Sequence, residues 1–280
     1  MFVDFLYLKA LIQGIVEGIT EFLPVSSTGH MILLDETVLK MDEDFTRVFE
    51  IVIQLGAILS VLVYFRKKVF DGVFITRSGK FGIDFGTPGW RLWLKVLPAL
   101  LPALVLGALF GGWIQDKLFN PVTVAVMLVL GGIALILVDR PAQSKKDAVR
   151  IGSIDQLSYK RAFGIGLAQC VAMIPGTSRS AATIVGGMGL GCSRELAAEF
   201  SFFLAIPTMF AASAYSMLKS GLDLECTQWI ALGIGFVTAF FVAWAVIAVF
   251  MRFIKNHDFR GFGYYRIILG IAVLLYFWLK

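Results

Sequence analysis

The sequence predicts an all-α, polytopic membrane protein with about six transmembrane helices and two re-entrant helix pairs, arranged as an inverted-topology repeat. Of the 280 residues, 58% are hydrophobic and only 16% are charged, a balance far from that of a soluble domain. Several apolar stretches reach the roughly 20 residues that cross a hydrocarbon core. Two further apolar segments are interrupted near their middle by proline, glycine and hydroxyl residues.

Full-length spans are expected at residues 47–66, 93–113, 120–138, 195–218, 227–252 and 263–279. The interrupted segments, residues 8–38 and 160–191, do not fit simple spans, and we expect each to be a re-entrant helix pair. The whole chain is then one membrane domain. Its first repeat half covers residues 1–140, and its second, inverted half covers residues 155–280.

Positive charge is concentrated in the loops at residues 66–91 and 139–161, which the positive-inside rule places in the cytoplasm. The segments at 35–44, 116–117 and 223–225 are poor in positive charge and are expected on the opposite side. The net charge of +5 therefore reflects topology, with membrane lipids as neighbours. No extended basic helix or basic domain suggests nucleic acid as a partner.

The two interrupted segments resemble each other. With a one-residue slip, Pro24 aligns with Pro175 and Ser27 aligns with Ser178. Each half would then hold one re-entrant pair and three spans, so the second half would enter the membrane from the opposite face. The tips of the two re-entrant pairs are expected to meet near the midplane of the bilayer.

Glu17 and Glu21 form an acidic pair in the first interrupted segment. Their spacing of four residues places both carboxylates on one face of a helix. Each ionisable side chain at the bilayer centre costs roughly 2.5–3.5 kcal/mol on insertion scales, so a functional site is the favoured interpretation. The pair would chelate a divalent cation, Mg²⁺ or Ca²⁺, or one member would act as an acid or base. A solvated pair near the interface is the alternative.

Ser26, Ser27 and Thr28 lie at the expected start of a new half-helix. Free backbone N–H groups and the positive end of the helix dipole favour an anion there. Simple capping is the alternative, although capping needs only one hydroxyl. His30 is expected within reach of Ser27, as a nucleophilic serine or a leaving-group acid requires.

Arg179 is the strongest single signal in the second interrupted segment. A guanidinium suits phosphate oxygens, because it offers paired donors in a fixed geometry. Ser178, Ser180 and Thr183 would complete a phosphate-binding shell. An internal ion pair of Arg179 with one of the two glutamates is an alternative that is compatible with this site.

Three segments together resemble the signature of a known family: Glu17-x-x-x-Glu21, Pro24-Val-Ser-Ser-Thr-Gly-His30 and Pro175-Gly-x-Ser-Arg-Ser-x-x-Thr183. The family is the bacterial undecaprenyl-diphosphate phosphatases of the bacitracin-resistance type, and the likeness covers essentially the whole chain. It implies hydrolysis of undecaprenyl diphosphate to the monophosphate and phosphate, which recycles the carrier lipid for cell-wall synthesis. It also implies a divalent cation, the bacterial inner membrane, and a site that opens toward the periplasm. The residues it associates with activity are Glu17, Glu21, Ser27, His30 and Arg179.

The sequence thus predicts a phosphoryl group held between the two tips, with the prenyl chain in an apolar groove between helices. Ser27 is the candidate nucleophile, with His30 or Glu21 handling its proton and with Glu17 and Glu21 holding the metal. Direct attack by water is left open. The rival class is a transporter or flippase of a phosphate-bearing lipid, because broken helices in inverted repeats also serve alternating access. A homodimer is also left open.

Overall fold

The computed structural model describes residues 2–34, 41–74, 81–139, 151–220 and 224–279. Within these ranges the chain is helical, without a β-strand, and six helices are long and apolar enough to cross a membrane. The prediction of six spans is therefore confirmed. They are α3 (Glu43–Tyr64), α5 (Pro88–Leu118), α6 (Pro121–Val138), α9 (Arg194–Ser220), α10 (Cys226–Phe253) and α11 (Arg260–Leu279).

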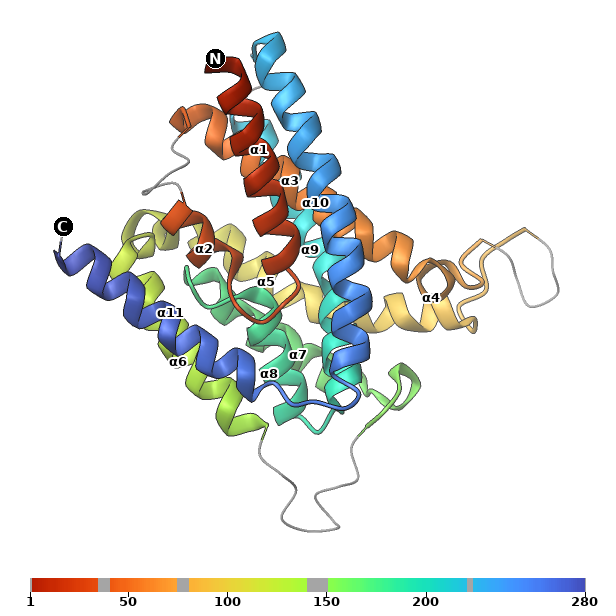
Figure 1. The fold of residues 1–280 in the computed structure, drawn as a ribbon. Coiled ribbons are helices and arrows are strands. Elements are labelled where there is room, and N and C mark those ends of the chain that lie inside the picture. The colour runs from red at the N-terminus through yellow and green to blue at the C-terminus, as the bar shows by residue number, and fades with distance from the viewer. Residues whose placement is uncertain (1, 35–40, 75–80, 140–150, 221–223, 280) are drawn as a thin grey trace.

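The two interrupted segments each form two helices joined by a turn. The first pair is α1 (Phe2–Thr20) and α2 (Ser27–Leu34), and the second is α7 (Tyr159–Cys170) and α8 (Arg179–Gly189). The remaining short helices are α4 (Arg66–Phe70), η2 (Ile154–Gln156) and η3 (Val171–Met173). In Figure 1, α2, α7 and α8 lie in the centre of the molecule, between the α6–α11 pair and the long α10.

The packing of the helices follows a pattern that a duplicated chain would produce. Helix α1 packs mainly on α10, and its counterpart α7 packs mainly on α5. The counterparts α3 and α9 pack on each other, as do α6 and α11. Glycines allow close approach: a Cβ on Gly14 would lie 2.7 Å from the Gly235 carbonyl oxygen, and one on Gly166 would overlap the Ala99 carbonyl. The inverted duplication itself stays a prediction.

The structure corrects the register in which the two halves were aligned. Ser26 and Ser178 are the two non-glycine residues of the described chain with positive φ, at 72° and 69°. Each caps the half-helix that follows it, because Ser26 Oγ accepts from the Gly29 N–H and Ser178 Oγ accepts from the Ala181 N–H. Ser178 therefore corresponds to Ser26, and the predicted match with Ser27 was wrong by one residue. In the corrected register Ser27 corresponds to Arg179.

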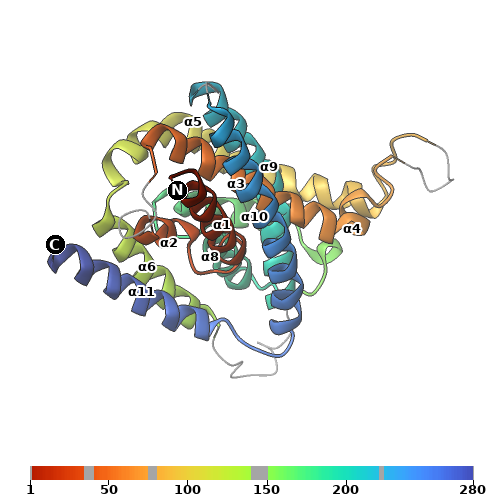
Figure 2. The ribbon, with the colours of Figure 1, turned by 45° about the horizontal axis from the view of Figure 1, so that its top comes forward.

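The ends of the spans that carry the basic loops meet on one side of the molecule. The buried Asp139 carboxylate, just after α6, accepts from Arg194 at the start of α9 at 2.8 Å and from the Phe259 N–H before α11 at 2.6 Å. Lys68 of α4 pairs with Glu199 of α9. In Figures 1 and 2 the N-terminus and the C-terminus lie away from this side. If the chain crosses the membrane six times, the span ends beside the basic loops must lie on the same face. Their grouping on one side of the molecule agrees with this topology.

Helix α9 is the central helix of the fold. About 72% of its span is buried inside the protein, against 22–44% for the other five spans. Its fully buried Phe202 contacts Phe22 of the α1–α2 turn edge to face, with ring centroids 5.3 Å apart. Because α9 also packs on α3 and α8, it supports the turns of both interrupted segments from one side.

Candidate functional site

The carboxylate of Glu21 connects the two interrupted segments. Its Oε2 accepts a hydrogen bond from Ser27 Oγ at 2.8 Å, and its Oε1 accepts from the Arg179 guanidinium at 3.1 Å. Ser27 and Arg179 are the first residues of α2 and α8. A further bond runs from Ser180 Oγ to the Leu23 carbonyl at 2.9 Å. The expected meeting of the two tips is thus observed, and it includes the ion pair that was the alternative interpretation of Arg179.

Arg179 is held on several sides and still has a donor to offer. Its Nη1 donates to the Ser201 carbonyl of α9 at 3.0 Å, and its guanidinium carbon lies 5.8 Å from the centroid of the Phe22 ring. The Nε–H is buried and has no hydrogen-bond partner. A buried donor without a partner is costly, so the Nε–H is the one part of this guanidinium that the described residues leave unsatisfied.

Glu17 supplies an acceptor in the same region. Its side chain is 2% exposed, which excludes a solvated position at the interface. Its Oε1 is buried and has no hydrogen-bond partner. The charged groups that act on this carboxylate are Glu21, Glu50 and Arg179, so three acids and one guanidinium share the region. Glu50 belongs to α3, outside both interrupted segments.

The predicted phosphate-binding hydroxyls fall into three groups: helix caps, buried hydroxyls and one partly exposed hydroxyl. Ser26 and Ser178 are helix caps, as the simpler interpretation held for such residues. Ser180 and Thr183 are fully buried and bond within the protein, Ser180 to Leu23 and Thr183 to Ser201 Oγ at 2.6 Å. Thr28 is partly exposed at the second position of α2. Four of the five hydroxyls therefore have a structural partner in this arrangement.

His30 does not contact Ser27 in the way the sequence suggested. Its Nδ1 lies 2.7 Å from the Ser26 carbonyl oxygen, and its Nε2 lies 2.6 Å from the hydroxyl of Tyr265 on α11. Both ring nitrogens are thus occupied, and the hydrogen-bond partner of Ser27 is Glu21. No local pattern pointed to Tyr265, because its partner is 235 residues away.

Arg266 is the functional residue that the sequence analysis missed. It is the seventh residue of α11 and is 0% exposed. Its guanidinium donates only to backbone carbonyls among the described residues. They belong to Pro24 of the first turn, Gly176 and Thr177 of the second, and Met127 and Leu128 of α6. A charged side chain within an apolar span was the available signal.

The site fits a divalent cation only in part. Within the described residues, no three His, Cys, Asp or Glu side chains are grouped so that they could hold a metal ion. Both oxygens of Glu21 are engaged, whereas Glu17 Oε1 has no partner. Mg²⁺ commonly takes one or two carboxylates and completes its shell with substrate phosphates and water. Of the two glutamates, Glu17 is thus the one with a carboxylate oxygen that no described residue occupies.

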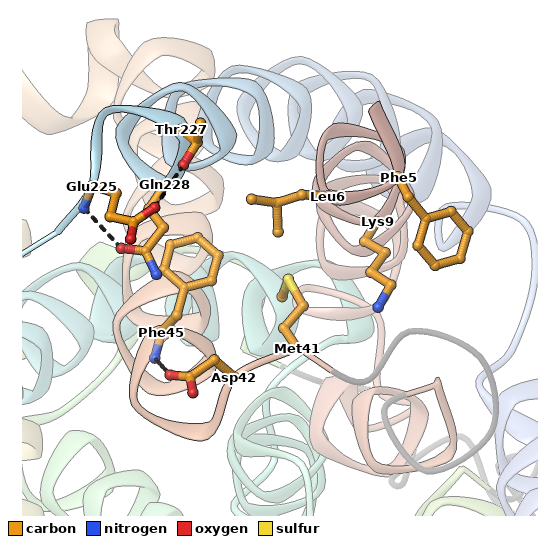
Figure 3. Close-up of a pocket in the computed structure, with 9 residues that line it drawn as sticks. All are labelled: Phe5, Leu6, Lys9, Met41, Asp42, Phe45, Glu225, Thr227 and Gln228. Atoms are coloured by element: carbon orange, nitrogen blue, oxygen red, sulfur yellow. Dashed lines mark hydrogen bonds between the residues drawn. The ribbon is translucent and has the colours of Figure 1, made fainter. Parts of the chain in front are cut away.

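A hollow with both polar and apolar lining residues lies apart from these residues. It has a volume of about 270 Å³ and is bordered by the first turns of α1, the start of α3 and the start of α10 (Figure 3). Lys9, Asp42 and Glu225 are among its lining side chains. Lys9 precedes Glu17 by two helical turns, or about 12 Å along α1. None of the predicted site residues lines this hollow.

Comparison with known proteins agrees with the resemblance seen in the sequence. The model of the family described as "Bacitracin resistance protein BacA" matches residues 10–272. A protein named undecaprenyl-diphosphatase 1 from Clostridioides difficile is 50% identical over 97% of this chain and 96% of its own. Proteins named undecaprenyl-diphosphatase from Enterococcus faecalis and Acetivibrio thermocellus are 47% and 46% identical, over 98% and 96% of this chain and 99% and 97% of theirs.

Replacing Arg266 with methionine should separate the two turns. The change leaves the carbonyls of Pro24, Gly176 and Thr177 without their donor, and each buried carbonyl left unsatisfied costs about 1–3 kcal/mol. We expect a loss of about 3 kcal/mol or more in the free energy of unfolding, measured by denaturation in detergent. Arg252→Met, at an exposed arginine of α10, is the control. Equal stability of the two variants would contradict the role given to Arg266.

Proposed function

This chain belongs to the family of the bacitracin resistance protein BacA, and we propose that it hydrolyses undecaprenyl diphosphate to undecaprenyl phosphate and inorganic phosphate. The observation that carries the proposal is the pair of unsatisfied groups beside Glu21. The Arg179 Nε–H is a donor without an acceptor, and Glu17 Oε1 is an acceptor without a donor. A phosphate with an associated cation would satisfy both groups if it entered between the two interrupted segments.

In the proposed reaction Ser27 Oγ attacks the terminal phosphorus of the diphosphate. Its proton passes to Glu21, whose Oε2 already accepts that hydrogen bond at 2.8 Å. The new bond joins Ser27 Oγ to phosphorus, the bridging P–O bond breaks, and undecaprenyl phosphate leaves with the bridging oxygen. Water then cleaves the phosphoserine and releases inorganic phosphate. Direct attack by water, activated by Glu21, is the variant of this scheme.

Arg179 is the residue that we assign to the equatorial oxygens of the transferring phosphoryl group. Phosphoryl transfer depends on positioning and on electrostatic stabilisation of those oxygens. The contacts with Ser201 and Phe22 fix the guanidinium before substrate binds. The backbone N–H groups at the start of α2 and α8 add a favourable field for an anion.

We assign the divalent cation, Mg²⁺ or Ca²⁺, to Glu17, with Glu21 as a second ligand. Glu21 would have to release Ser27 or Arg179 to bind the metal, because both of its oxygens are engaged. When bound, the cation would reduce the negative charge on the phosphate oxygens and so favour attack by a nucleophile.

The membrane setting completes the proposal. A groove of about 280 Å³ between α6, α7 and α8 is lined almost wholly by apolar side chains and reaches Thr177, two residues before Arg179. We assign the first part of the prenyl chain to this groove. The site is proposed to open toward the periplasm from the bacterial inner membrane. The relatives cited above are named as phosphatases, and no observation here favours a transporter.

Release of inorganic phosphate from undecaprenyl diphosphate by the purified protein in detergent tests the function directly. A carrier performs no covalent chemistry, so absence of phosphate release would reject the proposal. Arg179→Ala should lower kcat by a factor of about 10² or more, which is the usual effect of removing one donor to a transition-state oxyanion. Arg161→Ala, at an exposed arginine of α7, should retain full activity.

Rapid quenching of the enzyme during turnover tests the role of Ser27. We expect phosphate bound covalently at Ser27, detected by mass spectrometry of the digested protein. Ser27→Ala should lose both the adduct and most of the turnover, whereas Thr28→Val should keep the adduct. Normal turnover in Ser27→Ala would instead establish direct attack by water.

Removal of divalent cations tests the metal assignment. A chelator should abolish phosphate release, and Mg²⁺ or Ca²⁺ should restore it. Glu17→Gln keeps the shape of the side chain but loses its charge, so the cation concentration for half-maximal activity should rise by about ten-fold or more. Glu195→Gln, at an exposed residue of α9, should leave that concentration unchanged. Full activity in excess chelator would exclude the cation.

A further inference from the structure

The environment of His30 determines which of its ring nitrogens carries the proton. The Ser26 carbonyl oxygen, 2.7 Å from Nδ1, can only accept a hydrogen bond, so Nδ1 carries a hydrogen. In the neutral imidazole Nε2 is then the acceptor, and the Tyr265 hydroxyl at 2.6 Å is its donor. The structure therefore fixes the less common tautomer of neutral histidine, with the proton on Nδ1.

Tyr265 also fixes the plane of the imidazole. The rings of His30 and Tyr265 are nearly parallel, with an angle of 9° between them and centroids 5.7 Å apart. The hydroxyl and the ring of Tyr265 thus restrain two different properties of His30, the tautomer and the orientation.

The alignment of Tyr265 with His30 follows from the residue beside it. Arg266 donates to the Pro24 carbonyl, two residues before Ser26. It also donates to the second turn and to α6. These bonds hold α11 in a fixed register against the turn whose Ser26 carbonyl orients Nδ1. Tyr265 points to the other side, where it is 45% exposed.

We propose that Tyr265 is a positioning residue that acts through His30. Its hydroxyl holds His30 with the proton on Nδ1 and leaves Nε2 as the one ring nitrogen that can take up a proton. Because Ser27 gives its proton to Glu21, the role left for His30 in the proposed reaction is to activate the water that cleaves the phosphoserine. The predicted effect on kcat rests on the proposed function, whereas the predicted tautomer of His30 does not.

The chain is well suited to a spectroscopic test, because it contains two histidines, His30 and His257. The exposed His257 lies on the α10–α11 turn and can be replaced by glutamine, so that ¹⁵N signals from labelled histidine come from His30 alone. In this background, with Tyr265 intact, the nitrogen shifts should report a protonated Nδ1 and an unprotonated Nε2. A protonated Nε2 in the neutral ring would overturn the proposal.

Tyr265→Phe removes the hydroxyl and keeps the ring. We expect the ¹⁵N shifts to become those of a mixture of tautomers. With undecaprenyl diphosphate as substrate, kcat should fall by about ten-fold, the scale of one hydrogen bond, with KM unchanged. Tyr264→Phe, at the exposed neighbour on α11, should behave as the parent does.

Unchanged ¹⁵N shifts in Tyr265→Phe, or equal kinetic losses in the two phenylalanine variants, would reject the positioning role. The spectra need no substrate. A parent enzyme that released no phosphate would therefore reject the proposed function alone, and the tautomer result would still decide the role of Tyr265.

Discussion

The structure depends on one buried guanidinium, that of Arg266, which joins the two turns that interrupt the helical backbone. Carbonyl groups freed by a turn inside an apolar environment have no water to bond, so the protein must supply donors. Arg266 supplies them to Pro24 in the first turn and to Gly176 and Thr177 in the second. Because one guanidinium serves both turns, the turns are held at a fixed separation. Together with the bonds of Glu21 and Ser180, this constraint places the side chains that meet between the turns.

The register of the two caps shows why the site is chemically asymmetric. Ser27 and Arg179 occupy equivalent first positions of α2 and α8, and both bond to Glu21. In the same register Glu17 corresponds to Gln169, and both carry a buried side-chain oxygen without a partner. Glu17 and Glu21 thus come from the first segment and the guanidinium from the second, whereas Glu50 comes from α3. Opposite charges from the two segments create a single site where they meet.

Much of the architecture could be predicted because it depends on local properties of the chain. Span length follows from hydropathy, and the predicted spans differ from the helices by a few residues at their ends. The interruptions follow from Pro24 and Pro175 with their hydroxyl neighbours. The one-residue error in aligning Ser178 arose because identity of residue type guided the match. The backbone conformation, with positive φ at Ser26 and Ser178, identifies the equivalent positions.

The sequence by itself determined that this chain crosses a membrane and that acids, hydroxyls and an arginine occupy its interruptions. Insertion cost makes such residues conspicuous wherever they occur. Only the tertiary structure decided their partners. A hydrogen bond forms or fails with a change of a few tenths of an ångström in the donor–acceptor distance, and the two residues can be up to 242 positions apart in the chain. It paired His30 with the Ser26 carbonyl and with Tyr265, and it gave Ser180 and Thr183 partners inside the protein.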